Sequence, residues 1–232
     1  MEDQKEKIEL TILMPCLNEE ANIACAIESA RKFLNKNQLN GEILVIDNQS
    51  TDDSVKIAKS LNVRVITETN RGYGNAVKCG IQHANGIYTI LSDCDTTYNL
   101  EDLLPFLNAL RNGASLVVGN RFAGGIEKGA MPFSHRYIGV PFLSWLGRKR
   151  YHITLQDFHC GLRGFHTLQA QNLKLKSEGM EFATELIAKF STSHLPIVEV
   201  PIALSVSKYP RRSHLHTIRD GLRHLLYIMS KS

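Results

Sequence analysis

The sequence predicts an α/β fold with a doubly wound, mostly parallel sheet and helices on both faces. The first half of the chain carries this prediction, because short apolar segments alternate there with longer amphipathic segments of helical period. The apolar segments are hydrophobic throughout and do not alternate with polar residues. That pattern is typical of strands that are buried on both faces of a parallel sheet.

Strands and helices are expected in regular alternation up to residue 122. The strands fall at residues 8–16, 41–48, 63–68, 86–93 and 115–122. The helices fall at residues 18–35, 50–61, 72–84 and 100–113. The first helix is expected to have Asn18 as its N-cap and acids in its first turn, and the fourth is expected to end at Gly113. We interpret residues 8–122 as a nucleotide-binding half.

The second half is less regular and follows a glycine-rich link. Its expected elements are a helix at 137–150, a loop at 156–165, a helix at 181–191, a strand at 196–205 and a basic amphipathic helix at 216–230. No polar linker separates the two halves, so we expect a single domain over residues 1–232.

Composition and charge restrict the class of protein. No long uninterrupted apolar run occurs and the first residues are charged, so we expect neither a transmembrane helix nor a secretory signal, and a cytoplasmic location. The five cysteines are odd in number and form no C-x-x-C pair, which favours reduced thiols.

The net charge is +4, but residues 203–232 alone hold six Lys or Arg against one Asp. This basic segment indicates an anionic partner.

Polar residues follow each of the five strands expected in the first half. In an open α/β sheet, ligands bind at the carboxyl ends of the parallel strands. The residues at these ends are Asn18 and Glu19, Asp47 and Asn48, Glu68, Asp93 and Asp95, and Asn120 and Arg121. Any one of them alone is equally typical of a helix cap or a solvated loop. Together they predict one site along one edge of the sheet.

Two aspartates separated by one residue, Asp93 and Asp95, close the fourth strand. Like charges at this spacing raise each other's cost of ionisation unless a cation lies between them. Mg²⁺ and Mn²⁺ take oxygen ligands and complete their shell with water and substrate phosphate, so two carboxylates suffice. The pair predicts a divalent metal that neutralises a leaving diphosphate, and an ordinary turn closing the strand is the alternative.

Basic residues are expected on the other side of the site. Four arginines lie in loops with glycine or aromatic neighbours: Arg71, Arg121, Arg136 and Arg163. Each alone is typical of a surface arginine, but together they predict a positive rim facing the metal. His159 and Cys160 lack zinc-ligand spacing, so we expect His159 to be a histidine satisfied within the core or a loop.

Seven segments resemble family 2 glycosyltransferases of the dolichol-phosphate mannosyltransferase-like, or polyprenyl-phosphate glycosyltransferase, branch. They are "ILMPCLNEEANI", "ILVIDNQSTDDS", "NRGYGNAVKCGI", "ILSDCDTTY", "LVVGNRF", "DFHCGLRGF" and "IRDGLRHL", spread over roughly residues 8 to 228. The resemblance implies a GT-A fold, a nucleotide-diphospho-sugar donor (a GDP- or UDP-sugar), Mg²⁺ or Mn²⁺ at a D-x-D motif, and inverting transfer of a hexose. The expected acceptor is a polyprenyl phosphate, dolichyl or undecaprenyl. Residues 123–205 would form the acceptor half and 206–232 a basic C-terminal helix.

The resemblance also implies roles for the candidate residues. The nucleoside would be held by Pro15, Asn18, Glu19, Asp47 and Asn48. Asp93 would face the ribose and diphosphate and, with Asp95, bind the metal. Arg121 and Arg136 would contact the diphosphate or an acceptor phosphate, with Arg71 as a further anion contact. Asp157, followed by Arg163, would act in the acceptor loop.

Two positions depart from the family's pattern. Asn48 stands where members more often have a second acid, and Thr97 stands where they often have a glutamine that completes the metal shell.

The expected chemistry depends on the acceptor. An anionic lipid phosphate needs little help from a base, so metal and arginines would supply most of the catalysis. A hydroxyl acceptor would make Asp157 a candidate general base.

Two other functions compete with transfer. "SDCDTT" also fits the D-x-D-x-T pattern of haloacid-dehalogenase-like phosphohydrolases, but three strand-helix units precede it and no later metal motif follows. A non-catalytic nucleotide-sugar-binding scaffold is the second alternative.

The basic tail helix is expected either to dock on the core or to lie peripherally at an anionic membrane surface. Nucleic acid is not an expected partner.

Overall fold

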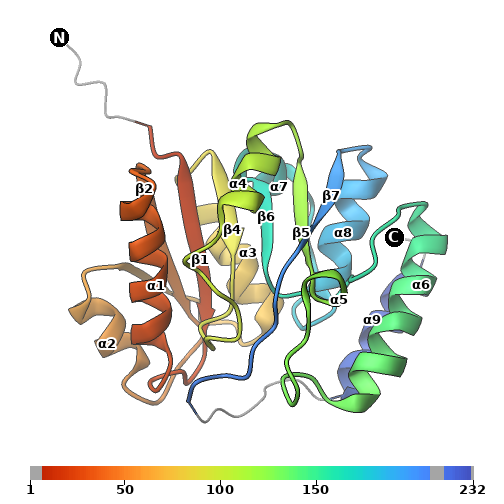
Figure 1. Ribbon diagram of the computed structural model, residues 1–232, viewed down its shortest axis with the longest axis horizontal. Coiled ribbons are helices and arrows are strands. Elements are labelled where there is room, and N and C mark those ends of the chain that lie inside the picture. The colour runs from red at the N-terminus through yellow and green to blue at the C-terminus, as the bar shows by residue number, and fades with distance from the viewer. Residues whose placement is uncertain (1–6, 210–216, 231–232) are drawn as a thin grey trace.

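The structure is a computed structural model that describes residues 7–209 and 217–230. Within these residues, seven strands form one sheet in the order β3-β2-β1-β4-β6-β5-β7 (Figure 1). Their bounds are β1 Leu10–Cys16, β2 Gly41–Asp47, β3 Arg64–Thr67, β4 Tyr88–Leu91, β5 Leu116–Asn120, β6 Arg163–His166 and β7 Ile197–Pro201. Of these described strands only β6 runs antiparallel to its neighbours, so the predicted mostly parallel sheet is confirmed.

Helices cover both faces of the sheet, as predicted. In the view of Figure 1, α1 lies in front of the sheet and α3 behind it, and α6 and α9 lie side by side beyond its β7 end. The helices are α1 Ile23–Lys36, α2 Ser54–Ser60, α3 Tyr73–His83, α4 Leu104–Arg111, α5 Arg121–Gly124, α6 Val140–Tyr151, α7 Thr167–Asn172, α8 Phe182–Thr192 and α9 Thr217–Met229. A π-helix, η1 His135–Gly139, leads directly into α6.

Three features differ from the sequence prediction. Residues 163–165, expected in a loop, lie in β6, which is only four residues long and too short to show a period. The short helices α5 and α7 were not expected for the same reason. Asn18 is not the N-cap of the first helix, because α1 begins at Ile23 and Asn18 adopts a left-handed conformation with φ of 54°. No acid lies in the first turn of α1.

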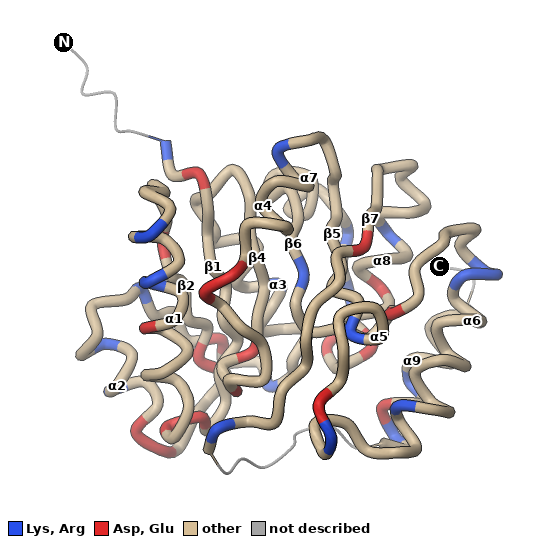
Figure 2. Tube along the Cα trace, viewed as in Figure 1, with Lys and Arg blue, Asp and Glu red and all other residues tan. Residues whose placement is uncertain are grey.

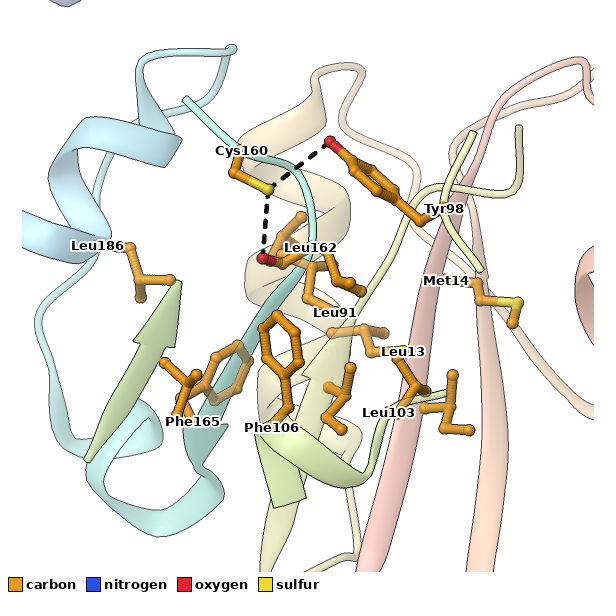
Figure 3. Close-up of a cluster of buried hydrophobic side chains, with 14 of the residues drawn as sticks. Leu13, Met14, Leu91, Tyr98, Leu103, Phe106, Cys160, Leu162, Phe165 and Leu186 are labelled. Atoms are coloured by element: carbon orange, nitrogen blue, oxygen red, sulfur yellow. Dashed lines mark hydrogen bonds between the residues drawn. The ribbon is translucent and has the colours of Figure 1, made fainter. Parts of the chain in front are cut away.

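The core forms where apolar residues of the strands meet the helices. One apolar face of α1 is buried, with Ile23, Ile27 and Ala30 fully inaccessible. Figure 3 shows a second part of the core, in which Leu91 of β4 and Phe165 of β6 lie near Phe106 of α4. Each buried side chain of this size stabilises the fold by about 1.5–3 kcal/mol.

The remaining expectations concern thiols, membranes and the tail. All five cysteines are free, as expected for reduced thiols, and Cys16, Cys94 and Cys160 are buried. Among residues 7–209 and 217–230, no helix combines the length and apolar character needed to cross a bilayer. Arg211 and Arg212 of the basic segment lie outside the described residues, as does Lys231.

Candidate active site

The topology brings two separate parts of the sequence to one edge of the sheet. β1 runs parallel to β2 and β4, so the polar residues after these strands share that edge. Antiparallel β6 places its first residue, Arg163, opposite Leu91 at the end of β4. The loop that precedes β6, residues 157–162, therefore enters the same edge from the second half of the chain.

A cavity of about 920 Å³ opens at this edge. Of the predicted site residues, those that line it are Pro15, Glu19, Asn48, Arg71, Asp93, Asp95 and Arg121. Those that do not line it are Asn18, Asp47, Arg136, Asp157 and Arg163. A cavity thus lies at the edge predicted from the strand ends, and five of the expected residues are not part of its lining.

The two aspartates of the predicted metal pair both line the cavity. Asp95 is 2% exposed, and its Oδ1 accepts hydrogen bonds from the Thr97 amide at 3.1 Å and the Thr97 hydroxyl at 2.6 Å. Carboxylate oxygens are the ligands that Mg²⁺ and Mn²⁺ prefer, so this donor set fits either ion. No group of three or more His, Cys, Asp or Glu in the described part of the chain is arranged to hold a metal. Water and a ligand's phosphate would have to complete its shell.

Asn48 connects the end of β2 to the loop before α3. Its Nδ2 donates to the carbonyls of Glu68 at 3.1 Å and Asn70 at 2.8 Å, and its Oδ1 accepts from the Gly72 amide at 2.8 Å. These bonds fix the position of the neighbouring Arg71 backbone, whose side chain lines the cavity. Asn48 is therefore a wall residue that also holds its own loop in place.

Asn18 and Asp47 stabilise the loop that follows β2. Asn18 Oδ1 accepts from the Thr51 amide at 2.8 Å, and Asp47 Oδ1 accepts from the Ser50 amide at 2.9 Å. Both side chains thus satisfy backbone donors of the turn, in the way short polar side chains commonly do. Their predicted contact with a nucleoside stays a prediction.

Arg121 and Asp157 form a buried, two-bonded ion pair. Arg121 Nε lies 2.6 Å from Asp157 Oδ2 and its Nη2 lies 2.8 Å from Oδ1. Asp157 is fully buried, and its backbone amide is fixed by Glu199 at 2.8 Å. Burial alone would lower the pKa of Arg121, but Tyr98 and Asp157 raise it above its ordinary value. Arg121 therefore stays charged at the cavity wall while Asp157 holds it from behind.

Arg163 and Arg136 lie outside the cavity wall. Arg163 is 1% exposed, donates to the carbonyls of Cys160 at 2.9 Å and Phe158 at 2.7 Å, and also bonds Ala183. It thereby fastens the loop at 157–162 to α8. Arg136 lies over the Tyr137 ring, 5.4 Å from its centroid. The predicted catalytic and phosphate-binding roles of these two arginines stay predictions.

The loop at 157–162 is also tied to the segment after β4. The Gly161 amide donates to the Tyr98 hydroxyl at 3.2 Å, and the Cys160 thiol lies between that hydroxyl and the Leu162 carbonyl (Figure 3). The segment that carries the two aspartates and the loop that carries Asp157 are therefore held together as one wall.

The C-terminal helix forms a wall that the sequence did not predict. α9 buries Asp220, His224 and Ile228, and the first two line the cavity with Arg219 and Arg223. In Figure 2 the basic positions of α9 lie in its lower part, and those of α6 lie at its upper end. Asp220 and His224 are four residues apart, and polar residues at that spacing share one face of a helix. This spacing was the sequence signal that could have predicted a polar face of α9 at the cavity.

Comparisons with known proteins identify relatives by sequence and by fold. Residues 11–173 match the family described as Glycosyl transferase family 2. The chain is 35% identical over 223 residues to the low-salt glycan biosynthesis hexosyltransferase Agl6 of Haloferax volcanii, covering 95% of this chain and 53% of that relative. The chain thus spans about half of that relative's length.

Other relatives carry names that refer to dolichyl phosphate. The chain is 27% identical over 194 residues to a dolichyl-phosphate hexose transferase of Haloferax volcanii, covering 84% of this chain and 82% of the relative. It is 26% identical over 233 residues to a dolichol-phosphate mannosyltransferase of Pyrococcus furiosus, covering 96% and 64%.

Among solved structures, the fold is similar to glucosyl-3-phosphoglycerate synthase from Mycobacterium tuberculosis. The complex of that synthase with Mn²⁺, UDP and glucosyl-3-phosphoglycerate aligns with a TM-score of 0.73 at 20% identity, covering 95% of this chain and 79% of the synthase. At this identity the likeness concerns the fold alone.

Proposed function

The chain belongs to glycosyltransferase family 2, in its dolichol-phosphate mannosyltransferase-like branch, and we propose that it moves a hexose from a GDP- or UDP-sugar to a polyprenyl phosphate with inversion. It is a hexosyltransferase-type enzyme with the GT-A fold. The observation that supports the proposal most is that Asp93, Asp95 and Arg121 line one cavity at the carboxyl edge of the sheet. That juxtaposition suits a substrate that joins a diphosphate to a transferable sugar.

The donor would lie along the walls made by β1, β2 and the start of α3. Pro15, Glu19 and Asn48 would face the nucleoside, and Arg71 the phosphates. Mg²⁺ or Mn²⁺ held by Asp93 and Asp95 would neutralise the charge that develops on the leaving diphosphate. Residues 8–122 would thus be the donor half and 123–205 the acceptor half of one domain.

Arg121 would bind the acceptor phosphate or the leaving diphosphate, and Asp157 would position it. Both carboxylate oxygens of Asp157 are bonded to Arg121, and the carboxylate is fully buried. A guanidinium held in this way is already oriented when an anion arrives, so little energy is lost in arranging it. A phosphate acceptor is anionic and needs no proton removed, which is consistent with an Asp157 committed to Arg121.

The acceptor's lipid chain would explain an apolar surface on α6 and α9. Phe142 and Trp145 of α6 are 51% and 43% exposed, and Ile218 and Leu222 of α9 are 87% and 53% exposed. Lys149 lies over the Trp145 ring, 4.3 Å from its centroid. Aromatic, aliphatic and cationic side chains together are typical of helices that lie in a membrane interface. We therefore propose peripheral contact of α6 and α9 with an anionic membrane surface on its cytoplasmic side.

A thermal-shift screen tests the donor site directly. UDP- and GDP-sugars are added with and without Mn²⁺, because a ligand that binds only the native state raises the melting temperature. At about 100 times its Kd a single ligand stabilises by about 2.7 kcal/mol, which corresponds to a shift of about 5 °C or more. We expect a shift with one nucleotide only, dependent on Mn²⁺.

Variants connect the shift to the aspartate pair. Asp95→Ala should abolish both the metal-dependent shift and sugar transfer, whereas Asp102→Ala, an exposed aspartate outside the cavity wall, should keep both. Wild-type turnover by Asp95→Ala would overturn the metal assignment. Donor binding without any turnover by the wild type would favour the scaffold function instead.

A further inference from the structure

His159 lies in the cavity wall with both ring nitrogens unpaired. It belongs to the loop at 157–162 and lines the cavity, yet among residues 7–209 and 217–230 neither its Nδ1 nor its Nε2 has a hydrogen-bond partner, and both atoms are buried. The expectation of a satisfied core or loop histidine is therefore wrong. A buried polar atom without a partner lowers stability, so such atoms in a functional cavity indicate a group that a ligand pairs.

The neighbour of His159 is a second histidine that does not pair with it. His224 of α9 stands edge-on to the His159 ring, with 4.5 Å between centroids and 87° between planes. His224 Nδ1 lies 2.8 Å from the Thr184 hydroxyl of α8, which fixes the ring. The contact places the loop at 157–162 directly against α9.

Both rings are neutral at pH 7. Burial lowers the pKa of His159 well below its ordinary value, and the neighbouring His224 and Arg121 add to this effect. Burial likewise lowers the pKa of His224 to about 4. A neutral imidazole keeps one N–H donor and one acceptor, so His159 can donate a hydrogen bond without carrying a charge.

Three arginines near α9 provide hydrogen-bond donors for an anionic ligand. Arg219 and Arg223 of α9 line the cavity with Arg121, on the wall that also carries His159. Each of these arginines is held by a carboxylate: Arg219 by Asp220 at 3.5 Å, Arg223 by Glu181 at 3.2 Å, and Arg121 by Asp157. Guanidinium groups positioned in this way suit a phosphate group.

We propose that His159 is a ligand-binding residue that donates a hydrogen bond to a phosphate oxygen of the acceptor, in a subsite between the loop at 157–162 and α9. A half-turn of the ring about its Cβ–Cγ bond would exchange the nitrogens with ring carbons, and in this orientation a ring nitrogen would meet the ligand. The inference rests on the proposed function, because it assigns one end of the same cavity to the acceptor. It makes α9 part of the binding site.

The experiment measures binding of a soluble short-chain polyprenyl phosphate and, separately, of the donor. The probes are farnesyl phosphate and the UDP- or GDP-sugar with Mn²⁺, and the readouts are titration calorimetry and the ring-nitrogen NMR signals of the histidines. The variants are His159→Phe, which keeps a ring without nitrogens, and His159→Gln, which keeps a donor. His166→Phe is the matched control, because His166 also has an unpaired Nδ1 and an edge-on aromatic neighbour, Tyr88, but lies outside the cavity wall.

We expect His159→Phe to weaken farnesyl phosphate binding about tenfold or more, since a hydrogen bond to a charged group is lost. His159→Gln should recover part of that loss, His166→Phe should bind like the wild type, and donor binding should be unchanged in all three. Farnesyl phosphate should shift the ring signals that are absent from His159→Phe. Unchanged farnesyl phosphate binding by His159→Phe, or a loss confined to the donor, would overturn the inference while leaving the transferase proposal intact. A wild type that binds no farnesyl phosphate would overturn both.

Discussion

Single side chains account for two departures from the family's pattern. Thr97 donates hydrogen bonds from both its backbone amide and its hydroxyl to Asp95 Oδ1, so it orients a predicted metal ligand. Asn48 donates to the carbonyls of Glu68 and Asn70 and accepts from the Gly72 amide. An ionised aspartate could not make the first two bonds, because a carboxylate has no donor.

The Arg121–Asp157 pair gives a prediction at the same scale. Asp157→Asn removes one partner of a buried ion pair, which should lower the free energy of unfolding by about 3–5 kcal/mol. Transfer to a polyprenyl phosphate should fall but remain measurable, since Arg121 stays in the wall with weaker orientation. Unfolding in urea and transfer assays with both acceptor types check this.

A double-mutant cycle separates positioning from direct chemistry. If Asp157 acts through Arg121, Arg121→Gln combined with Asp157→Asn should cost much less activity than the sum of the two single losses. Additive losses with the phosphate acceptor, or complete loss in Asp157→Asn, would show that Asp157 acts on the substrate itself. In Asp157→Asn, transfer to a hydroxyl acceptor should fall more than transfer to a polyprenyl phosphate.

The sequence predicted which residues line the cavity best where a strand end decides their position. Asp93, Asp95 and Asn48 follow parallel strands and lie in the cavity wall. Asp47, the last residue of β2, instead accepts a hydrogen bond from a turn amide, and residue type alone does not distinguish these uses. Arg163 was placed from its loop composition, which could not reveal that three backbone carbonyls surround its guanidinium.

At the scale of elements, the start of α3 packs backbone to backbone against the loop before α8. The Gly74 amide donates to the Glu178 carbonyl at 2.8 Å. A Cβ at Gly74 would lie 2.3 Å from the Ser177 carbonyl oxygen, closer than any real contact allows. This approach fixes the cavity wall that contains Arg71 and Met180.

Gly74→Ala should therefore destabilise the protein by about 1–3 kcal/mol, because the two backbones must separate. Gly221→Ala is the matched control, since a Cβ there meets nothing within 4 Å and Gly221 lies inside α9. That substitution should stabilise by up to about 1 kcal/mol through helix propensity. Urea unfolding of both variants checks the pair, and equal effects would contradict the close-packed arrangement.

The docking of α9 gives a pH-dependent prediction. Burial lowers the pKa of His224 to about 4, whereas the unfolded chain titrates near the ordinary value of 6.5. The neutral ring therefore contributes stability that is fully present above pH 6.5 and is lost as the pH falls towards 4. The contribution amounts to about 3 kcal/mol, because each unit by which the folded pKa lies below the unfolded pKa corresponds to about 1.36 kcal/mol.

His224→Gln, which is neutral at every pH, isolates this contribution from the titration of carboxylates. Urea unfolding at pH 7, 5.5 and 4 should show the wild type losing more stability than the variant across this range. Parallel losses in the two proteins would mean that His224 does not titrate with a lowered pKa.

Some elements were beyond prediction for a physical reason. β6 and α7 have four and six residues, so neither spans enough turns or alternations to show a period. The sequence of α9 shows a clear helical period, but it does not show which face of the helix packs against the rest of the protein. It buries Asp220 and His224 and exposes Leu222 and Leu226, which reverses the usual distribution.

For the whole molecule, the position of β6 decides how the two halves meet. It lies between β4 and β5 and is antiparallel to both, so the loop before it reaches the edge where β4 ends. Regular alternation in the first half predicted the parallel sheet. The insertion of a strand from the second half depends on contacts between residues far apart in sequence, and local patterns do not encode them.

The exposed apolar residues of α6 and α9 predict binding to vesicles that contain anionic lipid. Leu222→Asp and Phe142→Asp should each reduce cosedimentation several-fold, because each places a carboxylate in the proposed interface. Leu168→Asp is the control, since Leu168 is 59% exposed on α7, away from this surface. Binding should weaken as salt rises. Equal loss in all three variants, or no binding by the wild type at low salt, would contradict the proposed membrane contact.

Transfer itself tests the central claim most directly. The wild-type protein is incubated with labelled UDP- or GDP-hexoses, Mn²⁺ or Mg²⁺ and a polyprenyl phosphate, and label is measured in the lipid product. The account predicts labelled lipid from one nucleotide only, dependent on the polyprenyl phosphate and absent with Asp95→Ala. Donor binding with no labelled lipid from any nucleotide would contradict it.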